Sequence, residues 1–241
     1  MPHGPRPTER RRSGSRLPVA PRIPSALEQA ELPRDDLKDD GLYVSLEYSN
    51  LELANRNAIS VEIDRCRYSK VSFRQASLDR VLVSDSRFDG CDLANARAVD
   101  SSLLRVALTA CRMTGLSWIS GGVRETEFTN CRMSMTSFRF STFKNTLFAD
   151  CLIENADFQA ADLRGARFER CNLTGVQLSN AQMQGTQFAD CILTGINGVT
   201  SLQGAIMRST DIIDLAYVFA GALGIKIEDE YDNIRLKAYP L

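Results

Sequence analysis

Histidine is almost missing from this chain, and the other reactive residue types are poorly placed for chemistry. His3 is the only histidine among 241 residues, so the serines and threonines have no evident base and a metal ion has no imidazole ligand. The seven cysteines include no Cys-x-x-Cys pair, and no glycine-rich phosphate loop occurs. We therefore expect a non-enzymatic protein with no catalytic, cofactor-binding or metal-binding residues.

Long apolar runs and a charge excess are missing as well. No stretch approaches the roughly eighteen apolar residues that a membrane-spanning helix needs, and the first residues lack the apolar core of a secretory signal. The formal net charge is −1, which creates no overall field toward nucleic acid. We expect a soluble, cytoplasmic protein that does not contact membranes.

What the sequence does have is a five-residue period. From Tyr48 to Leu193 every fifth residue is apolar, at thirty consecutive positions. The residue two places before each of these is small or apolar, and between residues 46 and 196 only Arg56 puts a charge at either position. A period of five fits neither a helix nor a flat strand, so it predicts a solenoid in which both positions point inward.

The cysteines indicate the length of one turn. All seven occupy the small position, and six of them are twenty residues apart: Cys91, Cys111, Cys131, Cys151, Cys171 and Cys191. A second twenty-residue series is mostly aromatic: Phe88, Leu108, Phe128, Phe148, Phe168 and Phe188. Four units per turn therefore predict a square coil with one cysteine column and one aromatic column inside. Because the cysteine count is odd and the predicted column is buried, we expect reduced thiols that pack as small hydrophobes.

Several units also match a known family pattern. Ala156-Asp157-Phe158, Ala161-Asp162-Leu163, Ala166-Arg167-Phe168 and Cys171-Asn172-Leu173 resemble the A-(D/N)-L-x-x motif of pentapeptide repeat proteins. The resemblance covers about residues 41–200. It implies an all-β solenoid, a right-handed quadrilateral β-helix of about eight coils, with a C-terminal α-helix.

The N-terminal flank divides into two predicted parts. Residues 1–24 contain six arginines and one glutamate, and we expect a disordered basic tail; a basic arm that touches nucleic acid is the alternative. In residues 25–40, Ser25-Ala26-Leu27-Glu28 has the form of a capping box and predicts a short helix near 26–32. An acidic lead-in to the first coil follows, with Asp35, Asp36, Asp39 and Asp40.

The C-terminal flank, residues 201–241, predicts a capping and dimerisation helix followed by a tail. Ser209 or Thr210 would cap the helix and Gly224 would end it, with a short closing strand at 225–227. The helix is apolar almost all round, which suggests a second copy as partner. In Qnr-type and MfpA-type pentapeptide proteins a similar C-terminal segment joins two solenoids end to end. We expect a homodimer through residues 209–227, with these candidates: Ile212, Leu215, Phe219 and Leu223.

The twenty-residue turn also maps the outer surface. Val99 and Ile119 fall on adjacent turns of one side with Phe140 beside the next turn, and a basic column stacks on another side: Arg124, Lys144 and Arg164. Clustered exposed apolar residues indicate a contact surface. We predict that these six residues form the partner site.

Two functions remain open at this point. One is a rigid protein-interaction scaffold whose partner the sequence does not identify. The other follows from the resemblance: Qnr-type and MfpA-type members mimic duplex DNA and bind DNA gyrase or topoisomerase IV, which implies fluoroquinolone or toxin resistance. Residues 46–200 carry 17 basic and 17 acidic residues, whereas a DNA mimic should present ladders of negative charge. The charge pattern therefore favours the scaffold.

Overall fold

A left-handed backbone at every fifth residue bends this chain into a square coil. In the computed structural model, which describes residues 16–213 and 215–226, the corner residues have φ near +55°, for example Asn50 at 53° and Asn130 at 53°. This conformation is unfavourable for an L-residue. Most corner amides are nevertheless satisfied, because they donate to a carbonyl of the next coil: Asn50 N–H to Ser69 O at 2.9 Å and Asn130 N–H to Ala149 O at 3.0 Å.

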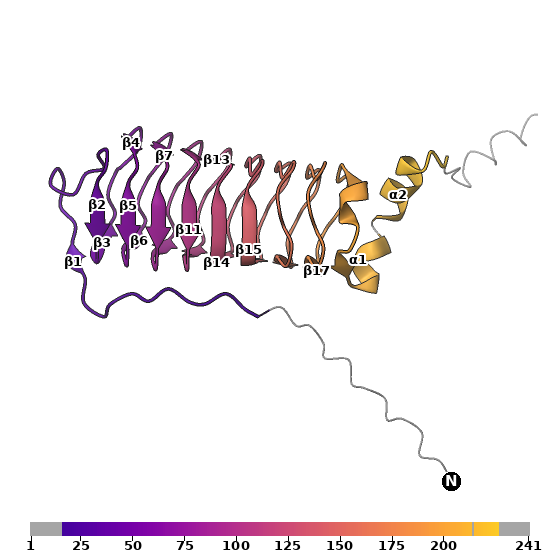
Figure 1. Cartoon of the computed structure of the whole chain (residues 1–241), viewed down its shortest axis with the longest axis horizontal. Coiled ribbons are helices and arrows are strands. Elements are labelled where there is room, and N and C mark those ends of the chain that lie inside the picture. Colours follow the sequence, from indigo (N-terminus) through magenta and orange to yellow (C-terminus); the bar gives the residue numbers. More distant parts are fainter. Residues whose placement is uncertain (1–15, 214, 227–241) are drawn as a thin grey trace, which may run out of the picture.

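Short strands connect these corners and stack into a rod (Figure 1). They are β1 (Glu28–Gln29), β2 (Leu42–Val44), β3 (Leu46–Ser49), β4 (Asn57–Ile59), β5 (Glu62–Asp64), β6 (Arg67–Ser69), β7 (Ser77–Asp79), β8 (Leu82–Ser84), β9 (Arg87–Asp89), β10 (Arg97–Val99), β11 (Ser102–Leu104), β12 (Ala107–Thr109), β13 (Ser117–Ile119), β14 (Gly122–Thr129), β15 (Thr142–Ala149), β16 (Arg167–Glu169), β17 (Gln187–Ala189) and β18 (Ile206–Met207).

The pairing confirms four sides and a turn of twenty residues. One side pairs β2, β5, β8, β11 and the first parts of β14 and β15, and the side after it pairs β3, β6, β9, β12, the second parts of β14 and β15, β16 and β17. A third side pairs β4, β7, β10 and β13. The fourth is a row of single bridges that runs from Glu52↔Ser72 to Asn172↔Ile192. All of these pairs are parallel, so the predicted β-solenoid is confirmed.

The predicted cysteine and aromatic columns lie side by side in the interior. All seven cysteines are buried and free, and each thiol lies within hydrogen-bonding distance of a carbonyl 23 residues earlier, as Cys151 Sγ does to Phe128 O at 3.4 Å. Burial raises the pKa of Cys66 to about 11, which keeps that thiol protonated. Phe128, Phe148 and Phe168 stack with ring centroids 4.9 and 4.8 Å apart, an offset geometry that adds to the energy of area burial.

Leu108 interrupts the aromatic stack and leaves a gap. It stands between Phe88 and Phe128 in the column, and around it lies an apolar void of about 70 Å³ that Trp118 also lines. A void of this kind is lined by apolar side chains and has no polar partners for water. The described interior is packed mainly with apolar side chains, with buried serine and threonine side chains such as Ser86 and Thr136 among them.

The N-terminal end of the solenoid is closed by residues 30–40, and here the predicted helix at 26–32 is wrong. Glu28 and Gln29 instead form β1, which pairs in parallel with Leu46 and Glu47 of β3. The capping box fails because a strand edge is available to pair with Glu28 and because Pro33 disfavours helical geometry at Leu32.

The acidic lead-in belongs to this N-terminal cap. Tyr43 Oη donates to Asp36 O at 2.6 Å and Tyr48 Oη to Asp35 O at 3.1 Å. The Asp36 side chain pairs with Arg56 at 2.8 Å. This pair explains the one charge in the inward columns, because Arg56 lies in the first coil and reaches the cap rather than the core.

The prediction of a disordered tail over residues 1–24 is wrong for residues 16–24. This segment, called the strap below, runs extended along the outside of the rod (Figure 1). Val19 N–H donates to Glu125 Oε2 at 2.9 Å and Arg22 N–H to Asp85 Oδ1 at 3.1 Å. Residues 1–15, which carry the other part of that prediction, lie outside the described residues.

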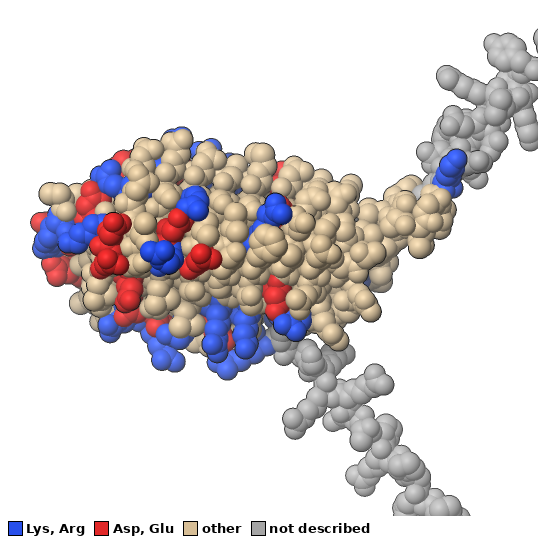
Figure 2. Space-filling view, turned by 45° about the horizontal axis from the view of Figure 1, so that its top comes forward, with Lys and Arg blue, Asp and Glu red and all other residues tan. Residues whose placement is uncertain are grey.

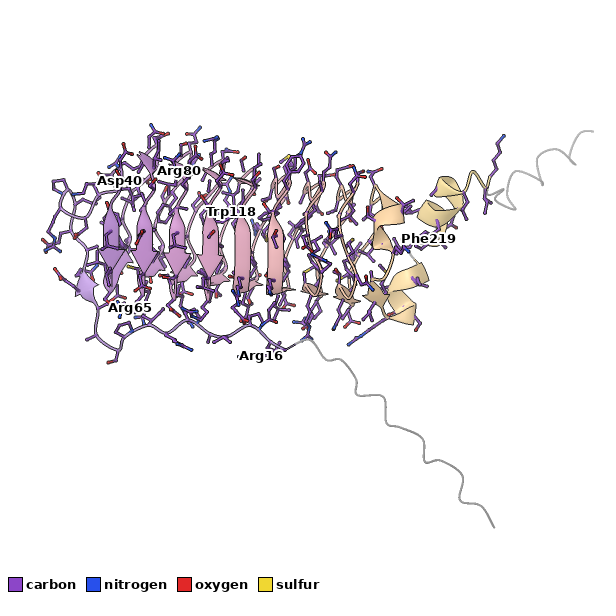
Figure 3. All side chains as sticks on the ribbon, viewed as in Figure 1. Arg16, Asp40, Arg65, Arg80, Trp118 and Phe219 are labelled. Carbon is purple, nitrogen blue, oxygen red and sulfur yellow. The ribbon has the colours of Figure 1, made fainter. Side chains whose placement is uncertain are left out.

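The C-terminal end is closed by a 3₁₀ turn and two short helices instead of the single predicted helix. The turn is η1 (Val199–Leu202), and the helices are α1 (Ser209–Ile213) and α2 (Ala216–Ala222). Leu215, between the helices, is fully buried, and Figure 3 shows Phe219 on α2 facing the last coil. Gly224 follows α2 with φ of 71°. Ile225 and Lys226 form no strand, and residue 227 lies outside the described residues. No helix in the described residues is long and apolar enough to cross a membrane.

The close contact between Gly121 and Trp118 gives a direct test of core packing. A Cβ at Gly121 would overlap the indole ring of Trp118, whereas at Gly122 it would meet Ser102 Oγ at 3.5 Å, an ordinary contact. We expect Gly121→Ala to destabilise the protein by about 1–3 kcal/mol through overpacking and to shift the emission of the single tryptophan. Gly122→Ala is the matched control, and equal urea midpoints for the two variants would contradict this packing.

Candidate functional site

Because the interior is filled, the functional groups of this protein lie on its outer faces and edges. Residues twenty apart form straight columns along the rod, so each face is a small set of columns. In the described part of the chain, no three His, Cys, Asp or Glu side chains are grouped so that they could hold a metal ion. Three outer features stand out: an apolar patch, a basic column and the edge that binds the strap.

The apolar patch lies on the side formed by β10 and β13. Val99 and Ile119 are register partners on these strands, and both are half-buried. Phe140 and Met135 occupy the two corners of the next coil, with 55% and 63% exposure. The structure thus brings the three predicted apolar residues together and adds Met135, which completes the patch.

Charged side chains border the apolar patch. Asp79 lies one coil before Val99, and its Oδ1 accepts a hydrogen bond from the Val99 amide at 3.0 Å. Above Ile119, the guanidinium carbon of Arg139 lies 5.5 Å from the centre of the Phe140 ring and Arg139 pairs with Asp157 at 3.7 Å. An apolar centre with a charged rim is the usual anatomy of a protein interface.

The basic column lies on the side of the rod that follows the Phe140 corner along the chain. Arg124 and Lys144 are register partners on β14 and β15, and both are exposed. Arg164 follows them in the next coil, where its guanidinium binds both oxygens of Asp162 at 2.8 and 2.6 Å. Arg124 and Lys144 have no carboxylate within ion-pair distance among residues 16–213 and 215–226, so they carry the free charge of this column.

Elsewhere, acidic and basic side chains alternate from coil to coil. Residues twenty apart pair as Arg112–Asp92 and Arg170–Asp150, at 3.5 and 2.7 Å. Figure 2 shows blue and red side chains interspersed over the N-terminal coils and a largely uncharged surface toward the C-terminal coils. Between Arg170 and Arg208 the sequence has only one charge, Asp190. The outer surface therefore carries no continuous negative ladder in the described coils.

The strap lies along one corner of the rod, here called the strap edge and defined by Asp85, Arg105, Glu125 and Asn145. These four residues occupy the same corner of successive coils. Arg105 binds both oxygens of Asp85 at 2.7 and 2.5 Å. Asn145 Nδ2 donates to Glu125 Oε2 at 2.6 Å and lies 3.4 Å from Leu17 O. The side chains of the edge are thus fixed by one another while they bind the strap.

Electrostatics at the strap edge favour a charged Asp85. The Arg105 guanidinium, which hydrogen-bonds to the carboxylate, holds the pKa of Asp85 below its usual value, and the amide of Arg22 lowers it further, against the opposing effect of burial. Sequence reasoning missed this site because its contacts join residues far apart in the chain. The available signal was the spacing of Pro18, Pro21 and Pro24, which the arginine-rich composition of the segment obscured.

The four predicted dimer residues separate into two groups. Ile212 and Leu223 are exposed, the latter at 76%. Leu215 is fully buried and Phe219 packs against the core, so these two close the solenoid and are unavailable to a partner. Tyr217 and Ile225 are also exposed and join Ile212 and Leu223 in an apolar C-terminal surface.

One family model agrees with the repeat architecture. Residues 122–197 match the family model described as pentapeptide repeat region. No curated protein matches the chain. Among solved structures, HetL, a pentapeptide repeat protein involved in heterocyst differentiation regulation from the cyanobacterium Nostoc sp. strain PCC 7120, is 17% identical, with 71% of this chain and 91% of that chain covered and a TM-score of 0.31.

Two further solved structures are similar at comparable levels. QnrB1, a plasmid-mediated fluoroquinolone resistance protein, is 15% identical in a trypsin-treated form, with 77% of this chain and 99% of that chain covered and a TM-score of 0.34. Rfr23, a pentapeptide repeat protein from the cyanobacterium Cyanothece 51142, is 11% identical, with 71% and 91% covered and a TM-score of 0.18.

The pair between Asp85 and Arg105 predicts a pH-dependent contribution to stability. A carboxylate whose pKa is lowered on folding stabilises the protein above its unfolded pKa, about 3.9, and that contribution is lost as the pH falls through the folded value. We expect Asp85→Asn to cost about 1.5 kcal/mol at pH 7 and less at a pH below about 3.9, where the carboxylate begins to be protonated, by urea unfolding. Asp150→Asn, at an exposed pair, should change little. If Asp85→Asn lowered the free energy of unfolding by the same amount at both pH values, this role of the ion pair would be refuted.

Proposed function

We propose that this chain, a pentapeptide repeat protein, is a non-enzymatic, cytoplasmic scaffold that binds a protein partner through the apolar patch and the basic column. One observation carries the proposal: Val99, Ile119, Met135 and Phe140 lie together on the surface of a rigid rod with a rim of charged residues. The filled interior supports binding over catalysis, because it offers no concave site where reacting groups converge.

The apolar patch and the basic column form one continuous binding region. They occupy adjacent faces that meet at the edge of Phe140, so a partner that wraps this edge would contact both. Phe140 and the neighbouring Arg139 are of the residue types that dominate interface energies, large aromatics and arginine. The free charges of Arg124 and Lys144 favour a partner whose matching surface is acidic.

A DNA mimic that binds DNA gyrase or topoisomerase IV is the competing function, and the surface charges support it less. Such a protein needs successive negative charges along its length, at the spacing of phosphates. Along this rod, acidic residues face basic ones on the next coil, as Arg105 faces Asp85 and Arg170 faces Asp150. The Arg124–Lys144 column carries charge of the opposite sign.

The apolar C-terminal surface supports a homodimer as the form in which the scaffold acts. Ile212, Tyr217, Leu223 and Ile225 are all more than half exposed, at the end of a rod whose last coils carry almost no charge. Burying such residues against a second copy would stabilise an end-to-end pair, since a twofold interface matches one patch with itself. A dimer would also present two apolar patches at a fixed distance.

The scaffold proposal predicts that charge in the apolar patch abolishes partner binding. We expect Met135→Glu with Phe140→Glu, and separately Val99→Glu with Ile119→Glu, to lose the proteins captured by the wild-type chain from native cytoplasm. The first pair should leave thermal stability nearly unchanged, since both side chains are mostly solvent-exposed.

Ile192→Glu provides the matched control for this experiment. Ile192 is 48% exposed on another face, so the variant adds the same charge away from the patch and should capture the same proteins as the wild type. Unchanged capture by both double variants would contradict the proposal. Inhibition of gyrase supercoiling by the wild-type chain, with or without a fluoroquinolone, would favour the DNA mimic instead.

The dimer proposal predicts a change of mass when the C-terminal surface is charged. We expect the wild-type chain to scatter light as a dimer at micromolar concentration, and Tyr217→Glu with Leu223→Glu to scatter as a monomer with an unchanged β-sheet spectrum. Ile192→Glu should stay dimeric. A wild-type monomer at tens of micromolar would overturn the dimer without bearing on the apolar patch.

A further inference from the structure

We propose that the strap edge is a recognition site for proline-rich peptides in the polyproline II conformation. In this chain the site is occupied by the strap, and a proline-rich segment of another protein would bind by displacing it. The site lies away from the apolar patch and next to the basic column, since Glu125 and Asn145 directly follow Arg124 and Lys144 in the chain. It uses none of the residues assigned to those two surfaces, so it stands whether or not they bind a partner.

The sequence of the strap is that of a polyproline II ligand. Pro18, Pro21 and Pro24 recur every three residues, which is the period of this helix, so they lie along one side of it. Each proline fixes its own φ near −65° and also biases the residue before it toward extended geometry. All three prolines are half-buried, as are Val19 and Ile23, while Ala20 and Arg22 are exposed. The prolines therefore contact the rod together with Val19 and Ile23.

The spacing of the ligand matches the spacing of the solenoid. Val19 and Arg22 are one polyproline II turn apart, about 9.3 Å along its axis. Their acceptors, Glu125 and Asp85, are two coils apart, about 9.6 Å at the inter-strand distance of parallel sheets. The residues after Pro18 and Pro21 thus present their amides to carboxylates two coils apart.

The strap edge is built to receive such a backbone. Its acceptors are held in place, since Arg105 fixes Asp85 through two hydrogen bonds and Asn145 fixes Glu125 through one. Asn145 also lies within reach of the carbonyl of Leu17. Beside Pro18 and Pro21 is a hollow of about 60 Å³, whose other walls are Val106, Ala107 and the charged residues Arg87, Glu125 and Glu127. The edge thus offers acceptors for the backbone amides and a hollow in which the two prolines lie.

The contacts between the strap and the rod are few enough for another peptide to replace the strap. Among the described residues the strap forms no strand pairing and is held by three hydrogen bonds, at Leu17, Val19 and Arg22. Each coil, by contrast, is bonded to both neighbours along its whole backbone. The strap therefore belongs to the parts of the molecule that open at the lowest free energy. Its attachment to the chain gives it an effective concentration in the millimolar range, which a competing ligand has to exceed.

The test uses full-length protein and a fluorescein-labelled synthetic peptide with the sequence of residues 16–25. Val19→Pro with Arg22→Pro removes both amide donors from the strap without altering the solenoid. We expect this variant to bind the peptide at least tenfold more tightly than the wild-type chain, by fluorescence anisotropy, because its own strap no longer competes. Adding Glu125→Ala should weaken that binding at least tenfold, and adding Asp150→Ala, on another edge, should leave it unchanged.

Two further measurements make the outcome decisive. A peptide that carries the same two proline substitutions should not bind. In the wild-type chain, amides of the strap should lose hydrogen-exchange protection when unlabelled peptide is added in millimolar excess, while the coils stay protected. Equal peptide binding by the wild type and the strap variant, or binding by neither, would overturn the proposal. If the wild-type chain is a dimer and the strap variant is a monomer, the strap edge binds the strap of a second copy. This result would also overturn the proposal.

Discussion

The structure depends on the backbone hydrogen bond that most corner residues donate to the next coil. A turn of five residues requires left-handed geometry at its corner, and most corners here are not glycine. One such residue is unfavourable by roughly 1–2 kcal/mol, so a single isolated coil would not hold its shape. Stacking gives most corner amides an acceptor and gives the inward side chains neighbours above and below. The coils are therefore stable only together, as in other repeat proteins.

The interior could be predicted almost completely from the sequence, because every inward contact repeats at a fixed separation of twenty residues. Cys151 predicts its neighbours Cys131 and Cys171, and Phe148 predicts its partners Phe128 and Phe168. The same rule located Val99 beside Ile119 and Arg124 beside Lys144. The twenty-residue rule does not predict the contacts of side chains beyond the last coil. Leu215 is an example. Its apolar character is evident from the sequence, but whether it packs against the last coil or against a partner depends on the path of the chain.

The flanks were predicted less well because their partners lie outside the repeat. Ser25 and Glu28 have the spacing of a helix cap, yet β3 offers Glu28 a strand to pair with, and this tertiary contact prevails over local propensity. The arginines of the first 24 residues suggested a solvated tail. The prolines among them instead fit a corner column whose members are spread from Asp85 to Asn145, and no local pattern reveals that match.

The strap gives the molecule an order of assembly. Each coil can add to the one before it as soon as twenty more residues are available, so the rod can grow from its N-terminal cap while the chain is being made. The contacts of the strap span 63, 106 and 128 residues. The strap therefore completes its contacts only after the coil of Asn145 has formed. A rod that ended at the coil of Asp85 would hold the strap at Arg22 alone, so full attachment of the strap requires that the coils through Asn145 have stacked.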